Sequence, residues 1–417
     1  MVPCTTGSAT FCSEGPGGTL LRFIVRRLLV AIPLLFASSI LTFVLAVNMG
    51  MPQKLEDLQT KPGVSPTAIR ALRHEYGLDK PVLTRYRQWI GGFLTGDWGK
   101  NSEQSPVRSD LWRSLVVTLK LLLFAQIASM VLGILVGLIS ALRQYSAFDY
   151  VMTGLAFFFF SIPTFVLASL FKQFLAIKIN PWFRQPSISL LMVLIFVGLG
   201  ILCGVGVIRN RYRYERKKPL SRIALGAVVG AGVVLAGVLI FKLGWEGNVY
   251  RKRNPKPLIP TQSEVTPGLK GSWWVHAQDF FWHAILPSLT LITIAFAGYS
   301  RYMRASMLET MNSDYVRTAR AKGISERRTV FRHAFRNALI PLTTVIALDF
   351  GSLLAGAIIT ETIFGWAGMG RFFTAALAKR EPAPIMAFVM VTAIAVIVFN
   401  LIADVLYARL DPRIRLD

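Results

Sequence analysis

Long uninterrupted apolar runs constrain this chain more than any other feature. A transmembrane helix needs about 20 mostly apolar residues, and eight stretches of the sequence approach that length. They lie near residues 28–47, 115–141, 150–171, 187–208, 223–241, 284–300, 339–360 and 385–407. Only 16% of the residues are charged, against roughly 25% in ordinary soluble domains. We therefore expect an all-α polytopic membrane helix bundle.

The first run follows three arginines, Arg22, Arg26 and Arg27, which is also typical of a signal peptide. The apolar core of a signal peptide is usually about 7–15 residues long. This run is longer and ends without a small-residue cleavage pattern, so we predict a retained first helix at 28–47 with residues 1–27 in the cytoplasm. Residues 1–20 are polar and glycine-rich, which fits either a disordered tail or an over-extended start.

The fourth and fifth runs are separated by a strongly basic segment, residues 209–218, in which six of ten residues are positive. One charge at the bilayer centre costs about 2.5–3.5 kcal/mol, so this segment must lie outside the hydrocarbon. Basic residues in short loops favour the cytoplasm. Counting spans from a cytoplasmic N-terminus then places the loops at 142–149, 209–222 and 301–338 and the tail 409–417 in the cytoplasm.

The same count leaves two long segments, 48–114 and 242–283, outside the cell. The basic cluster 251–253 in the second of them disagrees mildly with the rule, which is weak for long loops. The net charge of +24 would suit a nucleic-acid binder, but the basic residues alternate with the spans, so we expect them to set topology and meet anionic lipid, with no nucleic-acid partner.

Two local patterns stand out in these external segments. Ser65 before Pro66, with Gly77 after Tyr76, predicts a capped helix over residues 67–76. Residues 242–283 are proline-rich and carry tryptophans near the next span, which suit the membrane interface.

The cytoplasmic segment 301–338 is the most informative stretch. Asn312, Ser313 or Asp314 can cap a helix from residue 315 that stops at Gly323, a residue that tolerates left-handed backbone. A second helix can begin after Ile324, with Ser325 as cap and Glu326 in its first turn. Apolar residues then repeat at helical spacing, and these are Val330, Phe331, Ala334, Phe335 and Ala338. Such an amphipathic helix fits either a position on the inner leaflet or a docking site for a cytoplasmic protein.

Residues 314–323 (DYVRTARAKG) resemble the "EAA" loop of bacterial ABC-type importer permeases, in the form used by the dipeptide/oligopeptide and nickel subfamily. Arg317, Thr318 and Ala319 stand where the general consensus has Glu-Ala-Ala, and Gly323 matches its glycine. The closing proline would be Pro341. Further matching stretches are YGLDKP (76–81), GDWG (96–99), SIPTFV (161–166), HAILPSLT (283–290), ETIFGWAGMG (361–370) and DPRIR (411–415).

This resemblance implies the type I ABC importer permease fold, with the transmembrane domain over 115–408. The family ordinarily has six spans, and the stretch near 178–242 is an insertion that brings two more, eight in total. Because two is an even number, the later spans keep their family orientation. An apolar excursion that does not span remains the alternative for this insertion, and for the extra pair itself we expect peripheral packing.

The resemblance also implies partners: a second permease subunit, two ATP-binding subunits and an extracytoplasmic solute-binding protein. The sequence has no Gly-x-x-x-x-Gly-Lys-Ser/Thr loop, so we expect a transport subunit in the bacterial inner membrane, without catalytic residues, cofactor or metal site. Residues near Gly323 to Phe335 would form the coupling helix that ATP-driven closure pushes. The residues expected to couple to the ATPases are Arg317, Thr318, Ala319, Gly323, Glu326, Arg327, Arg328, Phe331 and Phe335.

Three acidic residues, Asp349, Glu361 and Asp404, lie in or near apolar runs. Buried charge in lipid usually faces a partner or a water-filled path, so these residues either line a translocation pathway or make helix-packing contacts, the second being our preferred interpretation. Gly351 with Ala355 and Ser352 with Gly356 give small-xxx-small spacing, which suits close helix contact.

Two other classes of function stay open at this stage. An ATP-independent secondary transporter would explain the spans but not a docking helix, and no inverted repeat is evident. A membrane-embedded enzyme lacks any catalytic pattern in the sequence. Within the importer class we favour di- or oligopeptides as substrate, with nickel chelates or another small solute as the alternative.

Overall fold

The computed structural model describes residues 16–181, 194–201, 224, 227–237 and 259–410. Within these ranges the chain is helical, and the one strand-like feature is an isolated bridge between Lys100 and Pro106. The all-α expectation is confirmed. Four helices in the described part (α1, α5, α12 and α18) are long and apolar enough to cross a membrane, or five spans if the helices on either side of Pro163 count as one.

The described chain divides into two compact units, residues 1–169 with 287–417 and residues 170–286. The helices are α1 (Pro16–Asn48), α2 (Gln53–Thr60), α3 (Pro66–Glu75), α4 (Val82–Thr95), α5 (Val107–Leu142), α6 (Ala147–Ser161), α7 (Thr164–Phe171), η1 (Lys172–Ile177), α12 (Trp273–Met311), α13 (Asp314–Ala321), α14 (Glu326–Arg328), η2 (Thr329–Phe335), α15 (Arg336–Gly356), α16 (Ile358–Phe364), α17 (Met369–Ala378) and α18 (Pro382–Leu410).

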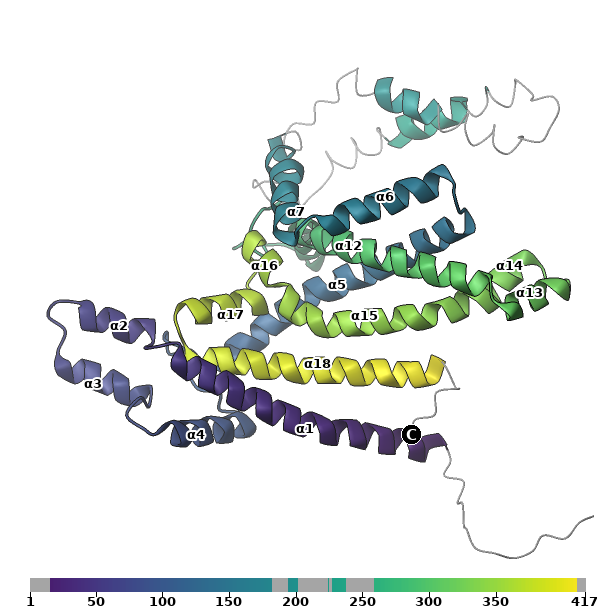
Figure 1. The fold of residues 1–417 in the computed structure, drawn as a ribbon. Helices are drawn as coiled ribbons and strands as arrows, with labels where there is room; N and C mark the ends of the chain where they lie inside the picture. Colours follow the sequence, from purple (N-terminus) through teal and green to yellow (C-terminus); the bar gives the residue numbers. More distant parts are fainter. Residues whose placement is uncertain (1–15, 182–193, 202–223, 225–226, 238–258, 411–417) are drawn as a thin grey trace, which may run out of the picture. The chain divides into compact units, whose positions relative to one another are not determined.

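Long helices packed side by side form the first unit. Helix α18 lies between α1 and α15 and contacts both along its length (Figure 1). Helix α5 contacts α6, α15, α17 and α18. Both α5 and α12 extend beyond the apolar runs that predicted them, since α5 begins at Val107 and α12 continues to Met311. These extensions carry helical structure outside the apolar runs themselves.

The segment between α1 and α5 folds into three short helices, α2 to α4. The helix predicted from its cap is confirmed: α3 begins at Pro66, and Ser65 Oγ accepts a hydrogen bond from the backbone N–H of Thr67 at 3.3 Å. Gly77 follows the helix with φ +62°, the left-handed backbone for which glycine is favoured. Local capping rules were therefore sufficient to place this helix.

Three short polar contacts connect the segment between α1 and α5 to the turn between α17 and α18. Lys379 Nζ lies 2.7 Å from Glu103 Oε1, and Arg380 Nη1 lies 2.6 Å from Glu56 Oε2. The backbone N–H of Gln53 donates to the Lys379 carbonyl at 3.0 Å. The start of α18 and the segment between α1 and α5 are thus connected at several points.

The second unit contains the region of the predicted inserted pair. Residues 194–201 and 227–237 are helical and close together, because a Cβ on Gly200 would lie 2.6 Å from the carbonyl oxygen of Gly230. Apart from residue 224, the rest of the predicted spans 187–208 and 223–241 lies outside the described residues. The count of eight spans, and the alternative of an apolar excursion, therefore stay predictions.

Candidate functional site: the loop between α12 and α15

Helix α13 opens the loop that the sequence singled out. Asp314 stands in its first turn, where a negative charge suits the helix dipole. Val316 and Ala319 are buried, while Tyr315 and Arg317 on the other face are exposed. The predicted helix is confirmed, although the Ser313 hydroxyl donates to the Thr310 carbonyl instead of accepting from the new helix.

The chain leaves this helix through Gly323, the residue at which the sequence predicted the helix to stop. Its φ is +74°, and its N–H donates to the Arg320 carbonyl while the N–H of Ile324 donates to the Ala319 carbonyl. This pair of bonds is the Schellman ending of a helix, which satisfies carbonyls that would otherwise be free. An L-residue at position 323 would be strained in this conformation, so the turn depends on glycine.

An ion pair closes this turn from one side to the other. Arg320 Nε and Nη2 donate to the two carboxylate oxygens of Glu326 at 3.1 and 2.7 Å. The hydrogen bond from Arg320 lowers the pKa of Glu326, and the same contact raises the pKa of Arg320. The sequence placed Glu326 in a first helical turn but did not reveal this partner.

The second predicted helix differs from the expectation in one respect. Residues 326–356 form one continuous helix through α14, η2 and α15 rather than a short separate helix. The stretch Thr329–Phe335 is π-helical, so each turn holds more residues than an α-helical turn. Val330, Ala334 and Ala338 consequently stay in line and are buried.

Phe331, which the sequence placed in the same apolar pattern and among the coupling residues, is 52% exposed. Phe335, in the same π-helical stretch, is half-buried. Arg327 and Arg328 are also exposed, and within the described ranges neither makes an ion pair or a side-chain hydrogen bond. The loop therefore presents aromatic and cationic side chains outward.

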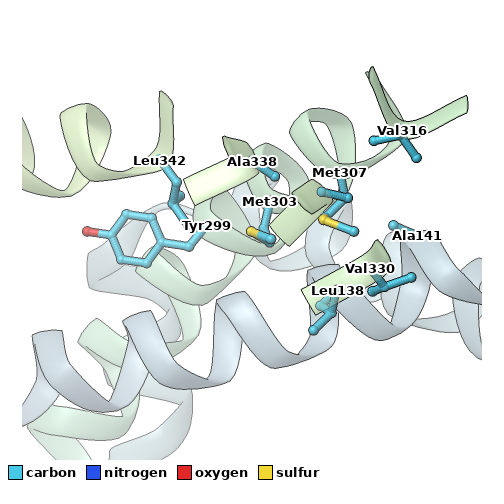
Figure 2. Close-up of a cluster of buried hydrophobic side chains, with 10 residues drawn as sticks. Leu138, Ala141, Tyr299, Met303, Met307, Val316, Val330, Ala338 and Leu342 are labelled. Carbon is cyan, nitrogen blue, oxygen red and sulfur yellow. The ribbon is translucent and has the colours of Figure 1, made fainter. Parts of the chain in front are cut away.

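The buried side of the loop belongs to a core shared with two long helices (Figure 2). Helices α5, α12, α13 and α15 and the π-helical stretch all contribute to it. Its members are Leu138, Ala141, Tyr299, Met303, Met307, Val316, Val330, Ala334, Ala338 and Leu342. The loop therefore packs directly against α5 and α12 through this core.

The remaining predicted residues take different positions on the loop. Arg317 is about 70% exposed and lies 3.9 Å from Asp314, and Thr318 is exposed while its hydroxyl bonds to the Asp314 carbonyl. Ala319 is buried. The structure thus brings the predicted coupling residues together in one compact segment, with Ala319 facing inward.

A close crossing of α5 and α12 was missed by the sequence reasoning. A Cβ on Gly133 would lie 2.5 Å from Tyr299 Cβ, and one on Gly137 would lie 2.6 Å from the Ser300 carbonyl oxygen. The signal was present, because Gly133 and Gly137 form a Gly-x-x-x-Gly pair in an apolar run. The Tyr299 hydroxyl, which accepts from Gln126 Nε2, adds a polar contact at the same seam.

Glu361 occupies a separate and buried position. Its carboxylate accepts hydrogen bonds from Thr118 Oγ1 at 2.5 Å and from the backbone N–H groups of Gly370 and Arg371 at 2.7 and 3.3 Å. Those amides belong to the first turn of α17, so Glu361 satisfies donors that a helix start leaves free. Gly368 packs directly on this carboxylate.

The other pathway or packing candidates are less fully described. Asp349 is half-buried in α15 next to the Tyr299 hydroxyl. Gly351 and Gly356 lie in α15 and Asp404 lies in α18, but their surroundings fall outside the described residues. A role for any of them in translocation or in packing stays a prediction.

Several helices of membrane-spanning length, with a compact basic loop between two long helices, define a polytopic helical membrane protein. The chain belongs to the family of binding-protein-dependent transport system inner membrane components. The model of this family matches residues 133–416, and the model of its N-terminal region matches residues 20–108. The resemblance seen in residues 314–323 is thereby confirmed, and the chain is a transport subunit rather than an enzyme.

Proteins similar to this chain match it almost from end to end. An oligopeptide transport system permease protein OppB of Mycobacterium tuberculosis (strain ATCC 25618 / H37Rv) is 32% identical over 94% of this chain and 99% of the relative. The oligopeptide transport system permease protein AppB of Bacillus subtilis (strain 168) is 31% identical over 94% of this chain and 98% of the relative. The dipeptide transport system permease protein DppB of Escherichia coli (strain K12) is 32% identical over 95% of this chain and 99% of the relative.

Proposed function

We propose that this chain is the permease subunit of an ATP-driven importer of di- or oligopeptides. The observation that carries this proposal is the end-to-end match to permeases named for oligopeptide and dipeptide transport. Uptake of labelled dipeptides, oligopeptides and a nickel chelate by a deletion strain tests the substrate. Loss of peptide uptake alone supports the proposal, and loss of nickel uptake alone overturns it.

The proposed assembly contains a second permease subunit, two ATPase subunits and an external solute-binding protein. The N- and C-termini lie in the cytoplasm of the bacterial cell, and anionic lipid meets the basic residues of the inner face. The support is the basic character of residues 301–338, because positive residues favour the cytoplasmic side. Accessibility of a cysteine added at the C-terminus to a membrane-impermeant reagent tests this orientation.

The loop formed by α13, α14 and η2 is the proposed docking site for an ATPase subunit. Exposed arginines and aromatic residues are the side chains most often found at the centres of protein interfaces, and Tyr315, Arg327, Arg328 and Phe331 supply them here. The buried side of the loop packs against α5 and α12. Closure of the ATPases would therefore push the loop and move the spans between inward-facing and outward-facing states.

Charge reversal at Arg327→Glu with Arg328→Glu tests this docking site in the reconstituted importer. We expect uptake to fall about tenfold or more, because loss of interface charge pairs typically costs several kcal/mol, while the ATPase subunits still hydrolyse ATP. The matched control is Arg70→Glu with Arg73→Glu on the exposed face of α3. In this control we expect ATP hydrolysis to remain coupled to uptake. Normal uptake by the first variant would overturn the docking proposal.

A further inference from the structure

The short turn between α5 and α6 carries an unusual residue. Tyr145 has φ +60° and is 72% exposed. A bulky residue in left-handed backbone is an outlier, and such outliers gather at functional sites. Arg143 and Gln144 beside it are exposed as well, so the tip of the turn presents an aromatic ring next to a cation.

Buried polar contacts hold this turn in place. Asp149 is buried, and its Oδ2 accepts from the backbone N–H of Tyr145 at 3.0 Å, while Ser146 Oγ accepts from the N–H of Asp149 at 3.2 Å. Arg304 of α12 donates from Nε and Nη2 to the two oxygens of Asp149 at 2.7 and 2.8 Å. Two parallel bonds of this kind fix geometry as well as distance, so the turn is tied to α12.

The turn lies beside the loop proposed to dock the ATPase. Ala141, in the last turn of α5, belongs to the same buried core as Val316 and Val330, and Figure 2 draws it next to Met307 in that core. Met303 also belongs to this core, and Arg304 directly follows it in the sequence. The hairpin tip of α5 and α6 and the helices α13 and α14 thus lie at one end of the unit (Figure 1).

We propose that the α5–α6 turn is a second docking point for the same ATPase subunit, with Tyr145 as its contact residue and Asp149 with Arg304 as positioning residues. The inference rests on the proposed docking of the α13–η2 loop, with which this turn is continuous. The turn repeats the chemistry of that loop, an exposed tyrosine near an exposed arginine, and both match an acidic and apolar partner surface. An anchor in lipid headgroups would not require so tightly held a turn.

Site-specific photo-crosslinking in the assembled importer tests the proposal. A photo-reactive benzoylphenylalanine is placed at position 145, at position 315 in the proposed docking loop, or at position 150 as control. Tyr150 is also an exposed tyrosine, 65% accessible, in the following helix. We expect crosslinks to the ATPase subunit from 145 and 315 and none from 150.

The two proposals fail in distinguishable ways. A crosslink from 315 without one from 145, or a crosslink from 145 only to lipid, overturns the second docking point and leaves the first intact. The absence of ATPase crosslinks from both positions overturns the proposed docking loop, and this inference falls with it. Asp149→Asn should lower the yield at 145 while leaving that at 315 unchanged, whereas a general loss of fold would lower both.

A functional variant separates contact from folding. Tyr145→Gly removes the ring but suits the left-handed backbone, so the turn is preserved. We expect about a tenfold fall in uptake, the typical effect of removing one important aromatic contact, and near-normal uptake for Tyr145→Phe. Uptake by Tyr145→Gly equal to that of the unmodified importer would overturn the proposal.

Discussion

Replacement of Gly137 by alanine tests the close crossing of α5 and α12. The added Cβ would lie 2.6 Å from the Ser300 carbonyl oxygen and 2.7 Å from Met303 Cβ, and real Cβ atoms essentially never approach closer than 3.0 Å. The Ser300 carbonyl oxygen is a backbone atom, so it cannot rotate away as the end of a flexible side chain can. The two helices must therefore move apart by a large fraction of an ångström.

The expected cost follows from two opposing contributions. Overpacking of a tight interface typically costs about 1–3 kcal/mol, and a gap of this size removes roughly a quarter to a half of the local dispersion energy. Alanine is a better helix former than glycine by about 0.5–1 kcal/mol. The net expectation is a loss of roughly 1–2 kcal/mol of stability, with the larger share from separation of the helices.

The appropriate measurement is the half-life of the folded chain in detergent at a fixed elevated temperature, because membrane proteins often unfold irreversibly. Gly298→Ala is the matched control: Gly298 lies in α12, and a Cβ there would meet nothing within 4 Å. We expect a shorter half-life for Gly137→Ala and an unchanged or longer one for Gly298→Ala. Equal half-lives for the two variants would refute the argument from close packing.

Two further outcomes follow from the hydrogen bonds. Glu361→Ala leaves buried donors on Thr118 and at the start of α17 without their acceptor, which costs about 1–3 kcal/mol for each unsatisfied group. We therefore expect the thermal half-life of the folded chain to fall more in Glu361→Ala than in Glu361→Gln. Equal half-lives for the two variants would contradict the assigned role of the Glu361 carboxylate. The Arg320–Glu326 pair is partly exposed, so Arg320→Ala should cost less than about 1 kcal/mol. Since the pKa of Glu326 is lowered on folding, the pair's small contribution is present at neutral pH and lost in acid, which a pH series of half-lives would detect.

The features predicted correctly from the sequence are those set by local rules. The start of α3 at Ser65 and the end of α13 at Gly323 follow from side-chain capping and backbone freedom within a few residues. Burial of Val330 and Ala334 follows from periodicity. The separation of the exposed Phe331 from the buried Val330, which share one apolar pattern in the sequence, could not be predicted, because it depends on packing against α5 and α12.

The features that were missed depend on contacts between distant parts of the chain. Asp149 and Arg304 are 155 positions apart, and neither lies in a sequence pattern that predicts their ion pair. Gly133 and Gly137 differ, because their spacing in an apolar run is a known signal for close helix contact. We interpreted that run only as a membrane span and did not use the spacing of its glycines to predict a helix contact.

The unbroken helix from residue 326 to residue 356 makes the end of the proposed docking loop intolerant of changes in length. Each residue added to an α-helix turns everything beyond it by about 100° and advances it by about 1.5 Å. A single insertion there would point the arginines of the loop in a new direction relative to the bundle. The glycine turn at the other side of the loop imposes no such register, so variation in length during evolution should be confined to that side.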